Sequence, residues 1–216
     1  MDADTTLTNT TADTTARTEL APNHHRDHPG FGGIRGFAMA LLFRVASGGR
    51  SRAVARLAGV RAGETVVDIG CGPGVAVRHA AKLGATVIGI DPAPVMLRVA
   101  RLTARHPRAR YALGTAEALP VDDAGADVVW SVATVHHWRD IDQGIAEVAR
   151  VLRPGGRFLA LEALSSPGAT GIASHGWTPD QARQFAERLR AGGFVDVSVD
   201  EHTGSRRAIS VLGRRA

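Results

Sequence analysis

The apolar positions of the chain follow two alternating patterns from about residue 61 onward. Short runs of β-branched residues, typical of buried strands, alternate with stretches whose apolar residues recur every three to four positions, as on one face of a helix. The runs predict strands over residues 65–69, 86–90, 110–113, 127–132 and 157–161. The stretches between them predict helices over residues 75–83, 92–105 and 141–152, and the segment "RPGG" is expected to end the last of these.

The C-terminal part of the chain predicts one further helix and a hairpin. Thr178 and Gln181 form a capping box with Pro179 at the first helical position, so a helix is expected over residues 179–191. The segment "VDVSVDEH" then alternates strictly, and "RRAISVLGRR" is its expected partner across a turn at residues 203–205. Alternating strands and helices that end in an antiparallel pair predict an open, mostly parallel α/β sheet.

The N-terminal part carries a different pattern. Residues 1–28 are rich in Thr, Asp and Ala without apolar periodicity, so we expect a disordered tail. Residues 29–60 predict short helices broken at Gly48 and Gly49, which either pack in the core or cap a pocket. A third alternative, interfacial membrane binding, is disfavoured because few cations are interleaved with the apolar face. The chain is long enough for one well-filled core, so we expect a single domain over residues 29–216, with the cap helices at 29–60 and the core at 61–216.

Composition places the chain among soluble globular proteins, with 44% hydrophobic and 22% charged residues. No apolar run reaches the ~20 residues of a membrane-spanning helix. The polar, acidic N-terminus lacks the pattern of a secretory signal, and we therefore expect a cytoplasmic protein. The single cysteine, Cys71, excludes an internal disulfide and any zinc site built on paired cysteines.

The net charge of +5 raises the question of a nucleic-acid partner. All but one of the 26 basic residues are arginine, a skew that favours a scattered, solvated arginine surface and argues against nucleic acid. The runs at residues 44–61 and 206–215 remain candidate contacts for anions.

Three glycines, Gly70, Gly72 and Gly74, separate the first predicted strand from its helix. Val75 stands where a dinucleotide-binding loop has its last glycine, and the loop has no lysine followed by Ser or Thr, so neither a dehydrogenase nor a nucleoside-triphosphate loop is favoured.

Two aspartates accompany this loop. Asp68 precedes the glycines, where it can serve an ammonium group, and Asp91 ends the second strand, where it can accept the hydroxyls of a ribose. Bare backbone N–H groups and a helix N-terminus suit a carboxylate. A ligand with amino, carboxylate and ribose groups is S-adenosylmethionine; the alternative is a tight turn without a ligand.

Five motifs carry a family resemblance: "VVDIGCGPG", "VIGIDPAPVM", "GTAEALP", "DVVWSVATVHHW" and "EVARVLRPGGRF". In this order and spacing, over residues 61–161, the chain resembles the class I S-adenosylmethionine-dependent methyltransferases, in particular their small-molecule subgroup of type 11. The resemblance implies a doubly wound, Rossmann-like sheet of seven strands in the order 3-2-1-4-5-7-6, with strand 7 antiparallel.

The resemblance also implies how the cofactor is bound. The glycine loop would line the methionine end, Asp91 the ribose, the residues after Asp91 and the third strand the adenine, and the end of the fourth strand the sulfonium. One departure is Ala93, where many relatives have serine. The cofactor-binding residues expected in this way are Asp68, Gly70, Cys71, Gly72, Gly74, Asp91, Pro92, Met96, Ala116, Glu117, Ser131, Val132, Ala133 and His136.

Methyl transfer from a sulfonium is an in-line displacement, so alignment and desolvation are the main requirements and a catalytic residue is optional. If the acceptor is a hydroxyl, it needs a base, and histidine suits neutral pH. His136 and His137 follow the fourth strand, and His175 is a further candidate; the alternative is that the pair only shapes the cofactor pocket. The remaining histidines lack ligand spacing, so no metal is expected.

Two absences narrow the acceptor. The fourth strand does not run into an Asn/Asp-Pro-Pro-aromatic turn, which argues against methylation of adenine. The short segment 164–177 leaves little room for a lid, so the aromatic side chains Phe37, Phe43, Trp138 and Trp177 could line an apolar acceptor site, although each taken singly is expected in the core.

We therefore expect a methyltransferase that acts at O, N or C of a small, apolar or aromatic molecule. The alternatives are a non-catalytic module that binds S-adenosylmethionine and an RNA methyltransferase; a homodimer stays open.

Overall fold

The computed structural model describes residues 48–169, 175–203 and 207–216. The strands are β1 (Thr65–Ile69), β2 (Thr86–Asp91), β3 (Ala109–Leu113), β4 (Ala126–Val132), β5 (Leu152–Ala163), β6 (Phe194–His202) and β7 (Ala208–Arg215). The helices are α2 (Gly48–Leu57), α3 (Val75–Lys82), α4 (Pro94–Thr103), the short 3-10 helix η1 (Val135–His137), α5 (Ile141–Val151) and α6 (Pro179–Ala191).

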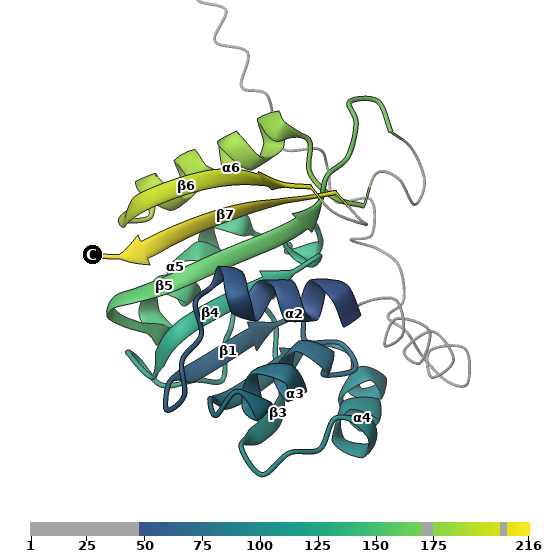
Figure 1. Cartoon of the computed structure of the whole chain (residues 1–216). Coiled ribbons are helices and arrows are strands. Elements are labelled where there is room, and N and C mark those ends of the chain that lie inside the picture. The colour runs from purple at the N-terminus through teal and green to yellow at the C-terminus, as the bar shows by residue number, and fades with distance from the viewer. Residues whose placement is uncertain (1–47, 170–174, 204–206) are drawn as a thin grey trace, which may run out of the picture.

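The seven strands form one sheet in the order β3-β2-β1-β4-β5-β7-β6 (Figure 1). The strands from β3 to β5 run parallel, and β7 pairs antiparallel with both β5 and β6. This is the predicted order, with the predicted antiparallel strand 7, so the expected Rossmann-like fold is confirmed.

Helices cover both faces of the sheet, and each face has its own apolar core. Val66 and Trp130 face α2 and α3, whereas Val67 and Phe158 face α5 and α6. Because successive residues of a strand point to opposite faces, central strands buried on both sides read as continuous apolar runs. This explains why "TVVDI" and "DVVWSV" could be recognised as strands from the sequence.

The segment "RPGG" follows the end of a helix, as predicted, but it already belongs to the next strand. α5 ends at Val151, and β5 begins at Leu152, five residues before the predicted start of the strand. Leu152 pairs with Ala126, and the register then shifts so that Val128 pairs with Arg157. The extra residues form a bulge that contains Gly155 at φ +75°. Pairing of Leu152 with β4 therefore extends β5 towards its N-terminus. Because this contact is between residues distant in the chain, no local sequence pattern predicted it.

The expectations for the N-terminal tail and for most of the cap helices lie outside the described residues. Only α2 belongs to the predicted range 29–60, and it packs against α3 and the sheet. Most of the predicted turn at 203–205 lies outside them as well. Among the described helices, none has the length and apolarity needed to cross a bilayer.

The capping box at the start of α6 is confirmed. The Thr178 hydroxyl accepts from the Gln181 N–H at 3.3 Å, and the Gln181 side chain accepts from the Thr178 N–H at 2.8 Å. The preceding residue, Trp177, packs on Phe185 with their ring centroids 4.8 Å apart, so the cap also fixes where the chain enters the core.

Replacing Thr178 by alanine is therefore expected to lower the free energy of unfolding by about 1 kcal/mol, because the Gln181 N–H loses its acceptor. Urea denaturation checks this, with Thr203→Ala, an exposed threonine outside any helix, as the control. Equal effects of the two substitutions would contradict the role of the cap.

Candidate active site

The loop after β1 is held against the ends of β2 and β4. The N–H groups of Gly70 and Cys71 both donate to the Ile90 carbonyl, at 2.8 and 3.0 Å. Gly70 has φ +71°, and a Cβ at this position would lie 2.5 Å from Cγ2 of Thr134. Glycine is thus required here both by the backbone conformation and by the close approach of the loop after β4.

Thr134 joins these two loops, a role that no pattern in the sequence predicted. Its hydroxyl donates to the Ile69 carbonyl at 3.1 Å and lies 2.5 Å from the Ser131 hydroxyl. Ser131 is fully buried, so its hydroxyl serves this internal contact, and the half-buried Val132 and Ala133 follow it. Ala133 has φ +55°, which turns the chain at the end of β4.

Asp91 fastens the glycine loop to the end of β2. Its two carboxylate oxygens accept from the N–H groups of Gly72 and Ala93, each at 2.8 Å. Burial raises the pKa of Asp91, and these two backbone bonds oppose the shift. Each oxygen keeps a further lone pair for a ligand hydroxyl. None of the described residues has an atom within 4 Å of the place where a side chain at Gly72 would begin, so this part of the chain leaves open space beside the loop.

Asp68 is a buried acid with an unsatisfied oxygen. Its side chain is 2% exposed, and Oδ2 has no hydrogen-bond partner among the described residues. Burial, reinforced by the Asp91 carboxylate, raises the pKa of Asp68 to about 8, and the neighbouring Trp130 indole opposes this shift. Because a buried polar group without a partner is costly, the position calls for a donor such as an ammonium group.

Cys71 supplies no nucleophile to this site. Burial first, and then the Asp68 carboxylate, raise the pKa of the Cys71 thiol, so it stays protonated. Its sulfur lies 3.7 Å from the Gly72 carbonyl, which it can bond as a weak donor.

The residues expected to surround the adenine follow the ends of β2 and β3. Met96 is buried in the first turns of α4, whereas Pro92 is exposed. Ala116 is buried in the core, and the Glu117 carboxylate accepts from the Arg139 N–H at 2.6 Å. Glu117 thereby joins the loop after β3 to the segment in front of α5.

The three candidate histidines lie together. The ring centroids of His136 and His137 are 4.0 Å apart, and that of His175 is 5.6 Å from the former and 6.1 Å from the latter. The sequence could not show this contact, because His175 lies far along the chain. Within residues 48–169, 175–203 and 207–216, no group of three or more His, Cys, Asp or Glu side chains has the arrangement of a metal site.

A glutamate that the sequence analysis did not single out holds His136. Glu162 on β5 is fully buried; its Oε2 lies 3.0 Å from Nδ1 of His136, and its Oε1 accepts from the Val135 N–H at 2.9 Å. With the carboxylate accepting, Nδ1 carries the proton and Nε2 is the acceptor nitrogen. Nε2 is buried and has no hydrogen-bond partner in the described part of the chain.

One signal could have found Glu162. A charged residue inside the apolar run "RFLALEAL" must be paired if the strand is buried on both faces.

Trp138 and Trp177 lie in the core, at 6% and 2% exposure, beside Phe158 and Phe185. The expectation of core packing for each is confirmed. The other aromatic residues proposed for an acceptor site, Phe37 and Phe43, lie outside the described residues.

Comparison with known families decides the identity of this arrangement. Residues 67–160 match the model of the methyltransferase domain family called Methyltransf_11. This range contains the glycine loop, Asp91 and the histidine pair, and it lies within the seven-stranded sheet described above. The family match and the strand order together support a class I S-adenosylmethionine-dependent methyltransferase domain around residues 67–160.

Individual proteins resemble this methyltransferase domain as well. The chain is 35% identical over 163 residues to the 27-O-demethylrifamycin SV methyltransferase of Amycolatopsis mediterranei, covering 70% of this chain and 56% of that protein. It is 38% identical over 112 residues to the demethylmenaquinone methyltransferase of Tropheryma whipplei, covering 51% and 46%. The chain thus spans about half the length of these curated relatives.

A solved structure supports the fold of the methyltransferase domain. The S-adenosylmethionine-dependent methyltransferase from Aquifex aeolicus superposes with a TM-score of 0.69 at 16% identity, covering 83% of this chain and 98% of that one.

The raised pKa of Asp68 predicts a pH-dependent stability of the ligand-free methyltransferase domain. An unfolded aspartate titrates near pH ~4 and the folded one near 8, so the folded state binds more protons between these values, and stability falls as the pH rises. Asp68→Asn removes this difference. Relative to the variant, the wild type is expected to lose roughly 2 to 3 kcal/mol of unfolding free energy between about pH 5 and pH 7.

Urea denaturation at the two pH values measures this loss. Asp122→Asn, at an exposed acid, is the matched control. If the two variants show the same pH dependence of stability, Asp68 does not have the raised pKa that this prediction assumes.

Proposed function

We propose that this chain is an enzyme that transfers the methyl group of S-adenosylmethionine to a hydroxyl group of a small, apolar or aromatic molecule. The observation that carries the proposal is His136, oriented by the fully buried Glu162 beside the end of β4. The names of two relatives support the acceptor class, since one acts on demethylrifamycin and the other on demethylmenaquinone.

The residues around the loop after β1 fit the cofactor. Asp68 offers its unsatisfied oxygen to the amino group, Asp91 its remaining lone pairs to the ribose hydroxyls, and the glycine loop its open side to the methionine end. Bound S-adenosylmethionine supplies a methyl group that is already activated by a positively charged sulfur. The protein has to bring the acceptor into line with this group and exclude water.

His136 then acts as the general base. Its Nε2 accepts the proton of the acceptor hydroxyl, while Glu162 holds the Nδ1–H and stabilises the imidazolium that forms. Glu162 itself is a positioning residue, because it acts only through His136. His137 and His175 lie close enough to contact the acceptor or to take over part of this role.

Cofactor binding tests the first part of the proposal. Asp91→Ala is expected to weaken the binding of S-adenosylhomocysteine by about tenfold or more, because the ribose loses its acceptor and the Gly72 N–H loses its partner. Titration calorimetry measures the affinity, and Asp122→Asn is the matched control. An unchanged affinity of a folded Asp91→Ala protein would contradict the assignment.

Turnover tests the base. A panel of phenols and hydroxylated quinones is assayed for acceptor-dependent release of S-adenosylhomocysteine. His136→Ala is expected to lower kcat by roughly 10² to 10⁴ with a nearly unchanged cofactor affinity. Glu162→Gln should lower kcat less and displace the acidic limb of the pH profile, a change that a purely structural role would not produce.

The outcomes of these assays separate the alternatives. His202→Asn, at a histidine on β6 that bonds Ser210, is the matched control. Full rates in His136→Ala and in a second variant, His137→Ala, would show that alignment alone suffices and would exclude the base. Tight cofactor binding without transfer to any acceptor would favour a non-catalytic binding module.

A further inference from the structure

The exposed or ion-paired cations of the described residues differ in their partners. Eight arginines between residues 150 and 214 form ion pairs with acidic side chains: Arg150, Arg153, Arg157, Arg183, Arg188, Arg190, Arg207 and Arg214. A second group is exposed and forms no ion pair in the described parts of the chain: Arg52, Arg56, Arg61, Arg78, Lys82, Arg98, Arg101, Arg105, Arg108, Arg110 and, apart from these, Arg139 in front of α5. Composition alone predicted an evenly scattered arginine surface, but the unpaired arginines are concentrated in one part of the chain.

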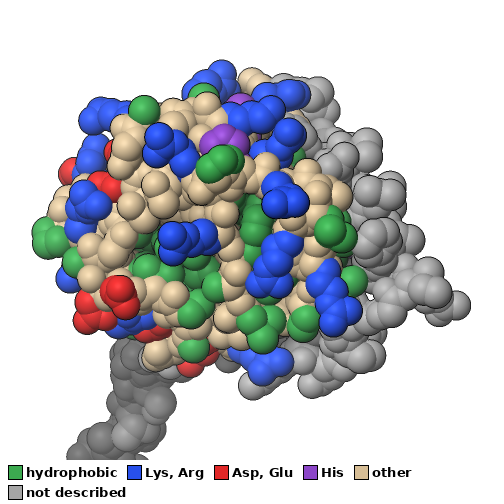
Figure 2. All heavy atoms as spheres, turned by 90° about the horizontal axis from the view of Figure 1, so that it is seen from below, with side chains coloured by type: hydrophobic (Ala, Val, Ile, Leu, Met, Phe, Trp, Pro, Cys, Tyr) green, Lys and Arg blue, Asp and Glu red, His purple; other side chains and the backbone are tan. Residues whose placement is uncertain are grey.

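The unpaired cations between residues 52 and 110 lie on and beside α2, α3, α4 and β3, which we call the cationic face. Between residues 65 and 116 the only acids are Asp68 and Asp91, and both are buried. Glu64, just before this range, is held by Arg157. In the view from below, blue side chains spread over this end of the molecule and red ones lie towards one margin (Figure 2). The face thus carries positive charge with no exposed acid to balance it.

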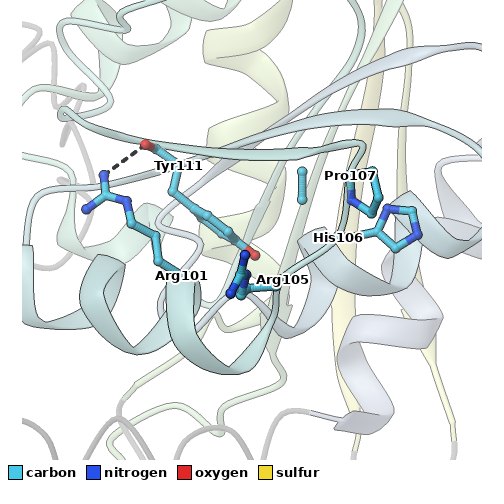
Figure 3. Close-up of a pocket in the computed structure, with 6 residues that line it drawn as sticks. Arg101, Arg105, His106, Pro107 and Tyr111 are labelled. Atoms are coloured by element: carbon cyan, nitrogen blue, oxygen red, sulfur yellow. Dashed lines mark hydrogen bonds between the residues drawn. The ribbon is translucent and has the colours of Figure 1, made fainter.

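Contacts between the elements show that these charges lie close together. Burial, followed by Arg52 on α2 and Lys82 on α3, lowers the pKa of His79. Arg101 on α4 donates to the Tyr111 carbonyl on β3 at 3.0 Å. Between α4 and β3 the face is hollowed by about 550 Å³, and the hollow is lined by Arg101, Arg105, His106, Pro107 and Tyr111 among others (Figure 3).

Exposed leucines accompany the cations. Leu102 is 71% exposed, Leu113 59% and Leu83 45%; they lie on α4, at the end of β3 and at the end of α3. Of the large apolar side chains that are exposed in the described residues, only Val195 lies elsewhere, on β6. Leu102 stands between cations one and three residues away, as on a helix that lies in a lipid headgroup layer.

We propose that the cationic face docks on an anionic phospholipid surface. The arginines and Lys82 contact lipid phosphates, the hollow beside Arg105 takes a headgroup, and the leucines enter the acyl boundary. Nucleic acid explains the face less well, because Tyr111 is the only Phe, Tyr or Trp between residues 75 and 113 and its hydroxyl is bonded to the Ala104 carbonyl. Protection of the edge strand β3 against pairing accounts for Arg110 but not for the cations of α3.

Co-sedimentation of the full chain with lipid vesicles tests this proposal. The protein is expected to bind vesicles with about 30% phosphatidylglycerol in phosphatidylcholine, not to bind pure phosphatidylcholine, and to lose roughly tenfold in affinity between about 0.05 and 0.3 M salt. The triple variant Arg98→Gln, Arg105→Gln, Arg108→Gln should bind at least about tenfold more weakly. The matched control removes three charges elsewhere, by Arg183→Gln, Arg207→Gln, Arg214→Gln, and should bind like the wild type.

Leu102→Gln keeps the charge and provides a second test. It is expected to weaken vesicle binding several-fold while leaving the salt dependence unchanged, because it removes only the apolar contact. Equal losses in the two triple variants, or equal binding to neutral vesicles, would overturn the proposal. Salt-dependent binding to a random RNA oligonucleotide without binding to vesicles would overturn it too, and would identify the face as a nucleic-acid surface.

Discussion

A carboxylate buried away from water needs a donor, and this requirement organises the candidate site. The buried acids of the described residues are Asp68, Asp91 and Glu162, and all three lie towards the carboxyl ends of β1, β2 and β5. Asp91 is satisfied by two backbone N–H groups, and Glu162 by one backbone N–H and His136. Asp68 alone keeps an oxygen without a partner. The protein itself thus supplies hydrogen-bond partners to Asp91 and Glu162, whereas Asp68 keeps an oxygen that a ligand can bind.

The fold makes this arrangement possible because parallel strands end at one edge of the sheet, where the strand order reverses between β1 and β4. Two apolar cores hold the strands from both faces, so their ends are fixed. Short hydrogen bonds then join the loops across strands, as Thr134 does between the loops after β1 and β4. These contacts hold the binding and reacting side chains in place before a ligand arrives. Little conformational entropy is therefore lost when the ligand binds.

Sequence patterns predicted those features whose cause is local. The strand at residues 65–69 and the helix at 179–191 matched the structure, because periodicity and a capping box are read from neighbouring residues. Features with a distant cause were missed: the early start of β5 depends on Ala126, and the role of Glu162 depends on a histidine 26 residues away. Charge shows the same limit, since a count of arginines says nothing of which of them meet an acid.

α4 connects the two surfaces on which the proposals rest. Its first turn follows Asp91 and buries Met96 beside the predicted adenine position, whereas its outer side presents Arg98, Arg101 and Leu102. A helix is only ~10 Å across, so a lipid surface that contacts the outer side would lie about one helix diameter from the cofactor site. For an apolar acceptor this closeness matters, because such a molecule concentrates in lipid rather than in water. A single amphipathic helix would then bring the methyl donor and the source of the acceptor to the same end of the sheet.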